Sequence, residues 1–517
     1  MLRYLTLVGA ASAAVAPFLP GGAARSDTVD WPVIGLAVGV IAVAALGFAR
    51  HRAARTAAVL AGVAAFGLVL RLLLPDLGAG LTGPRLPVLA VGAAAVALGV
   101  GASGGWRVRP VGVVAAVVAV AASVLAPVAV DAAVVDSETR DERGFAPPAV
   151  AQRLTGRQWA WQPPADVTAL VAAGHGVVVG LGGGTVVALD GADGDEQWRY
   201  TRSGAFVDNL VASKDGKAVV TTFRSSLDTR SQLLVVLDAD TGAVRFDRVI
   251  PSVLAEVEAL TPGTAVLAVR DRDVITGYDL VTGDEKWRWT PPEGCAVPYT
   301  RAVGGRTTVL TVVECPDAVR LLALDEATGA QRWQHEVPLD RDDRRRVDVH
   351  LAGTPDGALV SARITSTRAK PGAITLALFD AETGAVEYRP EPRWVVRADR
   401  GPAVLLEVQD GARATEVHVV DAATGTTRPL DAAVCPDRSA DATTATTYVR
   451  KCADDGRETT VVVQPLDGSP ATSVPVRMDG SGVLLKSFLV AAPGAVVVAR
   501  GAFGGTPAPV VGLVGRE

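Results

Sequence analysis

One short phrase recurs along the second part of this chain and limits the folds that the chain can adopt. An alternating run of Val and Leu ends at an Asp, a Gly follows four residues later, and an aromatic residue stands four residues after the Gly. Five copies carry all three residues: Asp190, Gly194 and Trp198; Asp238, Gly242 and Phe246; Asp279, Gly283 and Trp287; Asp325, Gly329 and Trp333; Asp380, Gly384 and Tyr388. A sixth copy keeps Asp421 and Gly425 without the aromatic residue, and a seventh keeps Asp467 and a turn.

Each part of the phrase has a physical role, and together they predict a β-hairpin. The alternating apolar residues form a half-buried strand. The Asp carboxylate accepts hydrogen bonds from backbone N–H groups two or three residues further on, and the Gly adopts a positive φ at little cost. A second strand then carries the aromatic residue, whose ring is buried between neighbouring sheets.

The spacing of the phrases predicts a β-propeller. The Asp markers recur about every 41–55 residues, the period of a four-stranded blade. Two inner strands precede each phrase; in the first unit we place them at Val167–Ala173 and Gly176–Gly180. After the seventh phrase only three strands follow, at Val483–Val490, Ala495–Arg500 and Pro509–Val514.

The missing fourth strand of the last unit stands at the opposite end of the repeat region. Arg157–Gln162 carries Trp159 and Trp161, which match Trp287 and Trp289, yet no strand of a phrase precedes it. We expect this strand to pair with Pro509–Val514, which closes the ring and covers a sheet edge. The prediction is an all-β, eight-bladed propeller over residues 155–517, preceded by a linker over residues 131–154.

The first 130 residues have a different composition and predict a transmembrane domain. They are mostly Ala, Val, Leu and Gly, and they contain five stretches of about 18–21 residues, the length that spans a bilayer. These stretches are Leu2–Leu19, Pro32–Ala49, Thr56–Leu74, Leu86–Ser103 and Pro110–Val130. Arg71 lies near the outer end of the third stretch, where we expect its side chain to snorkel to the headgroups.

The arginines between these stretches predict the orientation. One side holds Arg3, Arg50, Arg52, Arg55, Arg107 and Arg109, whereas the other holds Asp27, Asp30 and Asp76 with only Arg25 and Arg85. The positive-inside rule places the N-terminus in the cytoplasm and the propeller outside it. If the first stretch is instead a cleaved signal peptide, four helices remain and the propeller is still outside.

The four cysteines fall into two local pairs, Cys295 with Cys315 and Cys435 with Cys452, and each pair brackets an apparent hairpin. An oxidising exterior favours two disulfides, each stabilising the fold by about 3 kcal/mol. Four cysteines allow three connectivities, and the local one fits the hairpins best. The alternative is four reduced, buried thiols.

The phrase Leu/Val-Asp-x-x-Thr-Gly-x-x-x-Trp resembles the pyrroloquinoline-quinone-like (PQQ-like) propeller repeat, from about Thr155 onward. The resemblance implies the propeller fold. It leaves the function open, since such propellers include quinoprotein dehydrogenases and non-catalytic scaffolds, among them the propeller lipoprotein of the outer-membrane β-barrel assembly machinery. Membrane-bound quinoprotein glucose dehydrogenases also place five helices before an eight-bladed propeller. Their cofactor-binding insertions and the adjacent cysteines of related alcohol dehydrogenases have no counterpart here.

The sequence therefore favours a membrane-anchored, extracytoplasmic propeller that binds a protein or an envelope component without catalysis. No catalytic, cofactor-binding or metal-binding residue is assigned, and no cofactor is expected. The alternative is a divergent quinoprotein dehydrogenase, which would need pyrroloquinoline quinone and calcium. A third hypothesis is a sensor or transporter accessory that signals through a membrane partner. Nucleic-acid binding is not expected, because the chain has a net charge of −5 and no basic tract.

Overall fold

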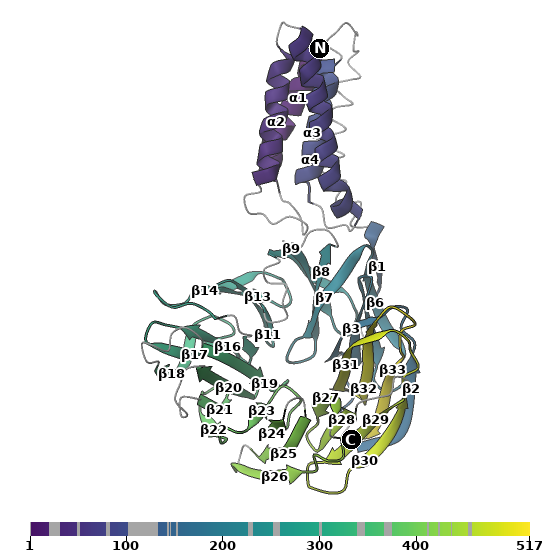
Figure 1. The fold of residues 1–517 in the computed structure, drawn as a ribbon, viewed down its shortest axis with the longest axis vertical. Coiled ribbons are helices and arrows are strands. Elements are labelled where there is room, and N and C mark those ends of the chain that lie inside the picture. Colours follow the sequence, from purple (N-terminus) through teal and green to yellow (C-terminus); the bar gives the residue numbers. More distant parts are fainter. Residues whose placement is uncertain are drawn as a thin grey trace.

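The computed structural model describes most of the chain. The described residues are 2–19, 31–48, 52–78, 83–101, 133–141, 144, 146–150, 153–225, 231–251, 259–298, 302–338, 347–366, 375–410, 413–421, 424–435, 437–452 and 458–516. Over these residues the chain forms a bundle of helices followed by a ring of β-sheets (Figure 1).

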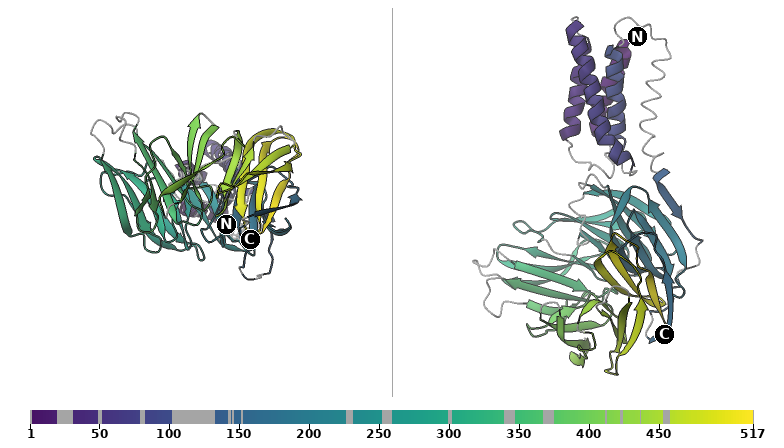
Figure 2. Two further views of the ribbon diagram at one scale, coloured as in Figure 1. Left: turned by 90° about the horizontal axis from the view of Figure 1, so that it is seen from below. Right: turned by 45° about the vertical axis from the view of Figure 1, so that its right-hand side comes forward.

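The described part of the N-terminal region contains four α-helices and a short 3-10 helix. They are α1 Leu2–Val15, the 3-10 helix Ala16–Phe18, α2 Trp31–Gly47, α3 Arg52–Gly78 and α4 Arg85–Gly101. Small residues let α1 and α4 pack closely: a Cβ added at Gly9 would lie 2.7 Å from the carbonyl oxygen of Gly92. The helices bury an apolar core of their own, so they form a bundle that is separate from the ring (Figure 2).

The helices do not support five membrane spans. Only α3 among the described helices is both long and apolar enough to cross a membrane, over Thr56–Leu73, with a mean hydropathy of 2.1. Helices α1, α2 and α4 have 14, 17 and 17 residues, and at about 1.5 Å per residue each is shorter than a bilayer core of about 30 Å. The fifth predicted span, Pro110–Val130, lies outside the described residues.

The strands confirm the eight-bladed propeller, with eight antiparallel sheets arranged in a ring. Blade 1 contains β3 Val167–Ala173, β4 Gly176–Leu181, β5 Thr185–Asp190 and β6 Glu196–Arg202, and blade 2 contains β7 Ala205–Ala212, β8 Ala218–Ser225, β9 Ser231–Asp238 and β10 Val244–Pro251. Blade 3 contains β11 Leu260–Pro262, β12 Val266–Asp271, β13 Val274–Asp279 and β14 Glu285–Trp289, and blade 4 contains β15 Val303–Gly304, β16 Thr308–Glu314, β17 Ala318–Asp325 and β18 Gln331–Pro338. Blade 5 contains β19 Val347–Gly353, β20 Leu359–Ser366, β21 Thr375–Asp380 and β22 Val386–Tyr388, and blade 6 contains β23 Val395–Arg397, β24 Val404–Asp410, β25 Arg413–Asp421 and β26 Thr426–Leu430. Blade 7 contains β27 Arg438–Thr443, β28 Thr447–Cys452, β29 Glu458–Pro465 and β30 Thr472–Arg477, and blade 8 contains β31 Val483–Ala492, β32 Ala495–Phe503, β33 Val510–Arg516 and β2 Arg153–Trp161.

The ring closes as the sequence predicts. Strand β2 is the outermost strand of blade 8 and pairs antiparallel with β33, with Trp159 opposite Gly512 and Trp161 opposite Val510. The register shifts between Leu154 and Gln158, and Gly156 has a φ of +81°. The Thr-Gly dipeptide of this segment therefore lies at a break in the register within β2 and not in a hairpin turn. As a result β2 begins at Arg153, before the predicted Arg157–Gln162.

The linker contains a strand that the sequence analysis did not predict. Strand β1, Val135–Glu138, pairs antiparallel with β6 and makes blade 1 a five-stranded sheet. Beyond β1, the backbone N–H of Arg140 donates to the carbonyl oxygen of Thr241 in blade 2, and Val150 bridges to Pro493 in blade 8. The described residues of this linker thus contact blades 1, 2 and 8.

Candidate functional site

The repeat aspartates act in turns, as the phrase predicts. In blade 2, Asp238 Oδ1 accepts from the backbone N–H groups of Asp240 and Thr241, both at 3.0 Å, and from the Thr241 hydroxyl at 3.1 Å. The same bonds recur at the other markers, to residues two or three positions on, at Asp190, Asp279, Asp325, Asp380, Asp421 and Asp467. These carboxylates stabilise the hairpin turns by accepting hydrogen bonds from donors within the same turn.

The phrase glycines join each blade to the one before it. Gly194, Gly242, Gly283, Gly329 and Gly384 have φ values of +69° to +82°. A Cβ at any of the five would lie 2.5–2.7 Å from the aromatic ring of the preceding blade: Trp159, Trp198, Phe246, Trp287 and Trp333. Each Trp indole also donates to a backbone carbonyl of the next turn, at Gly191, Ala239, Glu326 and Ala381, over 2.7–3.3 Å. This docking runs from blade 8 through blade 1 to blade 5.

The docking changes beyond blade 5. A Cβ at Gly425 would meet nothing within 4 Å, so Tyr388 does not dock on it. The sixth phrase has no aromatic residue; instead the Arg428 guanidinium donates to the Leu466 carbonyl oxygen in blade 7 at 2.8 Å. The interface between blades 6 and 7 therefore departs from the repeat, and departures of this kind are where functional residues are expected.

Charged side chains replace part of the apolar packing between blades 6 and 7. Glu407 on β24 is fully buried. Its Oε2 atom accepts from Arg438 Nη2 at 2.6 Å and from Arg397 Nε at 3.2 Å, so one carboxylate oxygen holds arginines from both blades. Gln409 Nε2 donates to the same oxygen at 3.2 Å.

A second buried carboxylate lies beside the first. Asp441 on β27 contacts Arg400 Nε at 3.3 Å and Arg438 Nε at 3.5 Å, and it accepts a hydrogen bond from the Tyr448 hydroxyl at 3.1 Å. Burial lowers the pKa of Arg400, but the charges of Asp441, Asp399 and Glu407 outweigh burial and raise it. Burial, and then the charge of Asp441, raise the pKa of Tyr448 well above its usual value. The arginines are therefore charged and the tyrosine is neutral at physiological pH.

Arg450 adds a third feature to this interface. Its side chain is almost fully buried, and no carboxylate among the described residues forms an ion pair with it. It donates to the Asp431 carbonyl oxygen at 2.8 Å and to Gln464 Oε1 at 2.6 Å, and its guanidinium lies 4.9 Å from the centroid of the Tyr448 ring. Burial lowers the pKa of Arg450. We call Arg397, Arg400, Glu407, Arg438, Asp441 and Arg450 the inter-blade charge cluster; it carries four cations and two anions.

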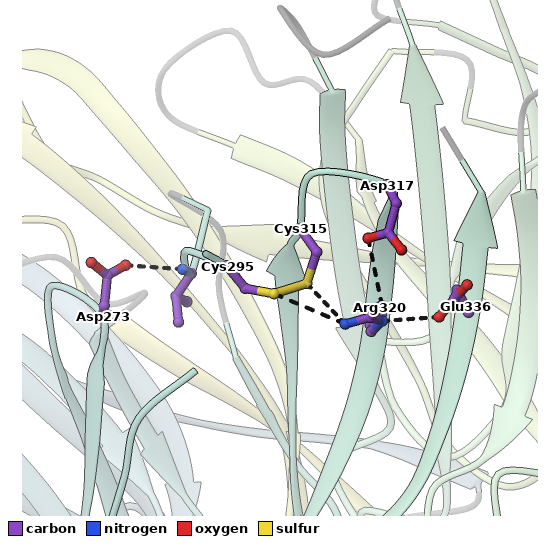
Figure 3. The surroundings of a disulfide bond; sticks show 7 residues. Asp273, Cys295, Cys315, Asp317, Arg320 and Glu336 are labelled. Atoms are coloured by element: carbon purple, nitrogen blue, oxygen red, sulfur yellow. Dashed lines mark hydrogen bonds and ion pairs between the residues drawn. A yellow bond between two sulfur atoms is a disulfide. The ribbon is translucent and has the colours of Figure 1, made fainter. Parts of the chain in front are cut away.

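Both predicted disulfides are present, and each brackets an inner hairpin. Cys295 is bonded to Cys315 around β15 and β16, and Cys435 is bonded to Cys452 around β27 and β28. Figure 3 shows Arg320 beside the first disulfide: its Nη1 lies 3.2 Å from the Cys315 sulfur, and it pairs with Asp317 and Glu336. On the other side of the disulfide, Asp273 accepts from the backbone N–H of Val297. No cysteine is free.

The described residues hold no group of three or more His, Cys, Asp and Glu side chains that could bind a metal ion. No sequence motif predicts the inter-blade charge cluster, because its members lie far apart along the chain. A charged residue inside an apolar strand was the available signal, since Glu407 interrupts the run Val404–Val408 and Arg450 follows Tyr448 and Val449. The residues that the sequence did predict, those of the repeat phrase and the four cysteines, lie instead in the turns, the blade interfaces and the disulfides.

The repeated turns, the docked aromatic residues and the closed ring of eight sheets define an eight-bladed β-propeller. Residues 182–428, just under half of the chain, match the family model described as outer membrane protein assembly factor BamB. No curated protein matches the chain.

Several solved structures are similar to this chain at low sequence identity. BamB from Moraxella catarrhalis is 18% identical, with a TM-score of 0.43, covering 70% of this chain and 100% of that one. The computationally designed Ika8 protein is 16% identical, with a TM-score of 0.41, covering 71% and 100%. The WD40 domain of SCAP from fission yeast is 8% identical, with a TM-score of 0.43, covering 70% and 98%.

Proposed function

We propose that this protein is a membrane-anchored, extracytoplasmic propeller that binds another protein or a component of the cell envelope and catalyses no reaction. The observation that carries the proposal is the use of the repeat residues. The phrase aspartates bond to their own turns, and the docked aromatic residues pack between blades. The recurrent polar and aromatic residues of the chain thus build the ring itself, which is what we expect of a propeller that acts as a scaffold.

Three further observations support this proposal. The matched family model is described as an outer membrane protein assembly factor, and this description names proteins rather than a small-molecule substrate. Two disulfides suit an oxidising compartment outside the cytoplasm. Helix α3 is long enough to cross a membrane, and the arginines of the N-terminal region favour an extracytoplasmic propeller.

The anchoring and the orientation can be tested by thiol labelling of intact cells. The four native cysteines are all in disulfides, so Ala53→Cys and Thr424→Cys each provide a single free thiol. A membrane-impermeant maleimide should label Thr424→Cys in intact cells and Ala53→Cys only after permeabilisation. Labelling in the reverse order would contradict the orientation, and recovery of the protein in the soluble fraction would contradict the anchor.

The binding role is tested by photo-crosslinking in intact cells, with the photoreactive residue placed on exposed propeller positions. We expect a discrete crosslinked species from some positions and none from a matched position on helix α3. The purified protein should not reduce a dye in the presence of alcohols or sugars, pyrroloquinoline quinone and calcium. Quinone-dependent dye reduction would overturn the non-catalytic proposal and favour a quinoprotein dehydrogenase.

A further inference from the structure

The inter-blade charge cluster and its surroundings carry a net positive charge. The four arginines lie near two buried carboxylates, Glu407 and Asp441, and a third carboxylate, the exposed Asp399, lies 3.6 Å from Arg400 Nε, so the arginines outnumber the carboxylates by one. The Arg400–Asp441 pair and the bond from the Thr443 N–H to the Arg400 carbonyl oxygen at 2.7 Å already connect blade 6 to blade 7. Burying unbalanced charge is costly, and a cluster with excess positive charge attracts an anion.

Glu407 holds two of these arginines in fixed orientations. Arg397 approaches the carboxylate through Nε, and Arg438 approaches the same oxygen through Nη2. Because Glu407 has no exposed surface, this arrangement is shielded from water and keeps its geometry. A guanidinium that is already oriented loses less freedom when it binds a ligand.

Some hydrogen-bond donors of the same two arginines are not used within the described part of the chain. Nη1 and Nη2 of Arg397, and Nη1 of Arg438, have no hydrogen-bond partner among the described residues. Their side chains are 24% and 10% exposed. A guanidinium fork with two free N–H groups matches the two oxygens of a carboxylate or a phosphate.

Both arginines lie on strands next to the centre of the ring. Arg397 is the last residue of β23 and Arg438 is the first residue of β27. These are the innermost strands of blades 6 and 7, since the phrase hairpins form the outer strands. A ligand that enters the ring centrally would therefore pass the two strands that carry these arginines.

We infer that Arg397 and Arg438, oriented by the buried Glu407, form a binding site for an oxyanion between blades 6 and 7. The ligand is a carboxylate or a phosphate group, bound bidentately by the Arg397 fork with Arg438 as a second donor. Glu407 is a positioning residue, and the site does not depend on the identity of the propeller's partner.

The test measures oxyanion binding to the purified full-length protein in detergent by isothermal titration calorimetry. The probes are inorganic phosphate and a short poly-glutamate peptide, each compared with chloride or poly-glutamine at the same ionic strength. Arg397→Gln should weaken binding at least tenfold, and Arg397→Lys should also weaken it because lysine lacks the planar fork. Arg393→Gln is the matched control, since Arg393 lies near the same strand, is 52% exposed and pairs with Glu416.

Each outcome has a defined meaning. Loss of phosphate binding alone identifies a phosphate site, loss of peptide binding alone identifies a carboxylate site, and either supports the inference. Equal affinities for Arg397→Gln and Arg393→Gln would overturn it, as would no binding of either probe by the unaltered protein. Thermal unfolding of each variant checks that Arg397→Gln is folded, which is expected because this arginine is partly exposed.

Discussion

Trp159 lies so close to Gly194 that a Cβ on the glycine would stand 2.5 Å from the indole ring. The indole Nε1 also donates to the carbonyl oxygen of Gly191 at 2.9 Å. On its other side the ring faces Gly512, its partner across β2 and β33. One side chain thus joins the strand that closes blade 8 to the turn of blade 1.

Replacing Gly194 by Ala should destabilise the propeller by about 2–5 kcal/mol. A positive φ of +82° costs a residue with a Cβ about 1–2 kcal/mol, and displacing the indole adds an overpacking cost of about 1–3 kcal/mol. The measurement is the free energy of unfolding in urea. Gly425→Ala is the matched control, because Gly425 has a φ of +66° but nothing lies within 4 Å of its Cβ position. Equal losses for the two variants would show that only backbone strain matters and that the docking of Trp159 contributes nothing.

Removing the Cys435–Cys452 disulfide should lower the free energy of unfolding by about 3 kcal/mol, because the bond closes a loop of about 17 residues in the unfolded chain. The variant is Cys435→Ser with Cys452→Ser, and the Cys295–Cys315 pair serves as an internal comparison. A reductant should lower the urea midpoint of the unaltered protein and leave a variant that lacks all four cysteines unchanged. A midpoint insensitive to reductant in the unaltered protein would contradict a stabilising role.

The repeat aspartates should make the propeller less stable in acid. Burial opposes the shift, but hydrogen bonds from Arg245 and Thr241 lower the pKa of Asp238; Lys286 and Val281 do the same for Asp279, and Arg332 and Thr328 for Asp325. Because each folded-state pKa lies below the unfolded value of about 3.9, the contribution is complete above about pH 4 and is lost as the pH falls through the folded values.

The variant that tests this contribution replaces all three aspartates by Asn. We expect a lower free energy of unfolding at pH 7, by about 0.5–1 kcal/mol for each partly exposed site, and a shallower loss between pH 4 and pH 2. Urea unfolding at a series of pH values gives both quantities. A slope below pH 4 that is as steep as in the unaltered protein would assign acid sensitivity to other groups.

The sequence was sufficient to predict the features that repeat. The Asp, Gly and aromatic positions predicted the turns, the blade count and the pairing of Trp159 with the last strand, because each copy of a periodic phrase obeys the same local rules. Cysteines that bracket a hairpin were similarly predictable, since the partners are close along the chain.

Features that depend on one contact between distant segments were not predictable. Glu407 meets Arg438 only because blades 6 and 7 pack side by side, and no local pattern marks either residue as a partner. Hydrophobicity alone also overestimated the membrane spans, because an apolar run does not specify where a helix begins and ends: α1 ends at Val15, before the predicted Leu19. Strand β1 escaped prediction because its sequence, Val-Asp-Ser-Glu, is mostly polar and its pairing to β6 is made by backbone groups.

Strand β1 of the linker covers the outer edge of blade 1. Asp136 pairs with Thr201 on β6, the Ser203 N–H donates to the Val134 carbonyl oxygen at 2.9 Å, and Arg140 contacts the buried Asp240 at 3.4 Å. Because hydrogen-bonded pairs alternate along an antiparallel ladder, the Val134–Ser203 bond makes Asp136–Thr201 the next hydrogen-bonded pair. Proline at position 136 removes an N–H group that faces β6 and disfavours pairing. Asp136→Pro should therefore speed hydrogen exchange in β6, measured by mass spectrometry on peptides that cover residues 196–202. Asp136→Ala keeps the backbone N–H and should exchange like the unaltered protein. If β6 exchanges equally slowly in the proline variant, the linker strand does not protect the edge of blade 1.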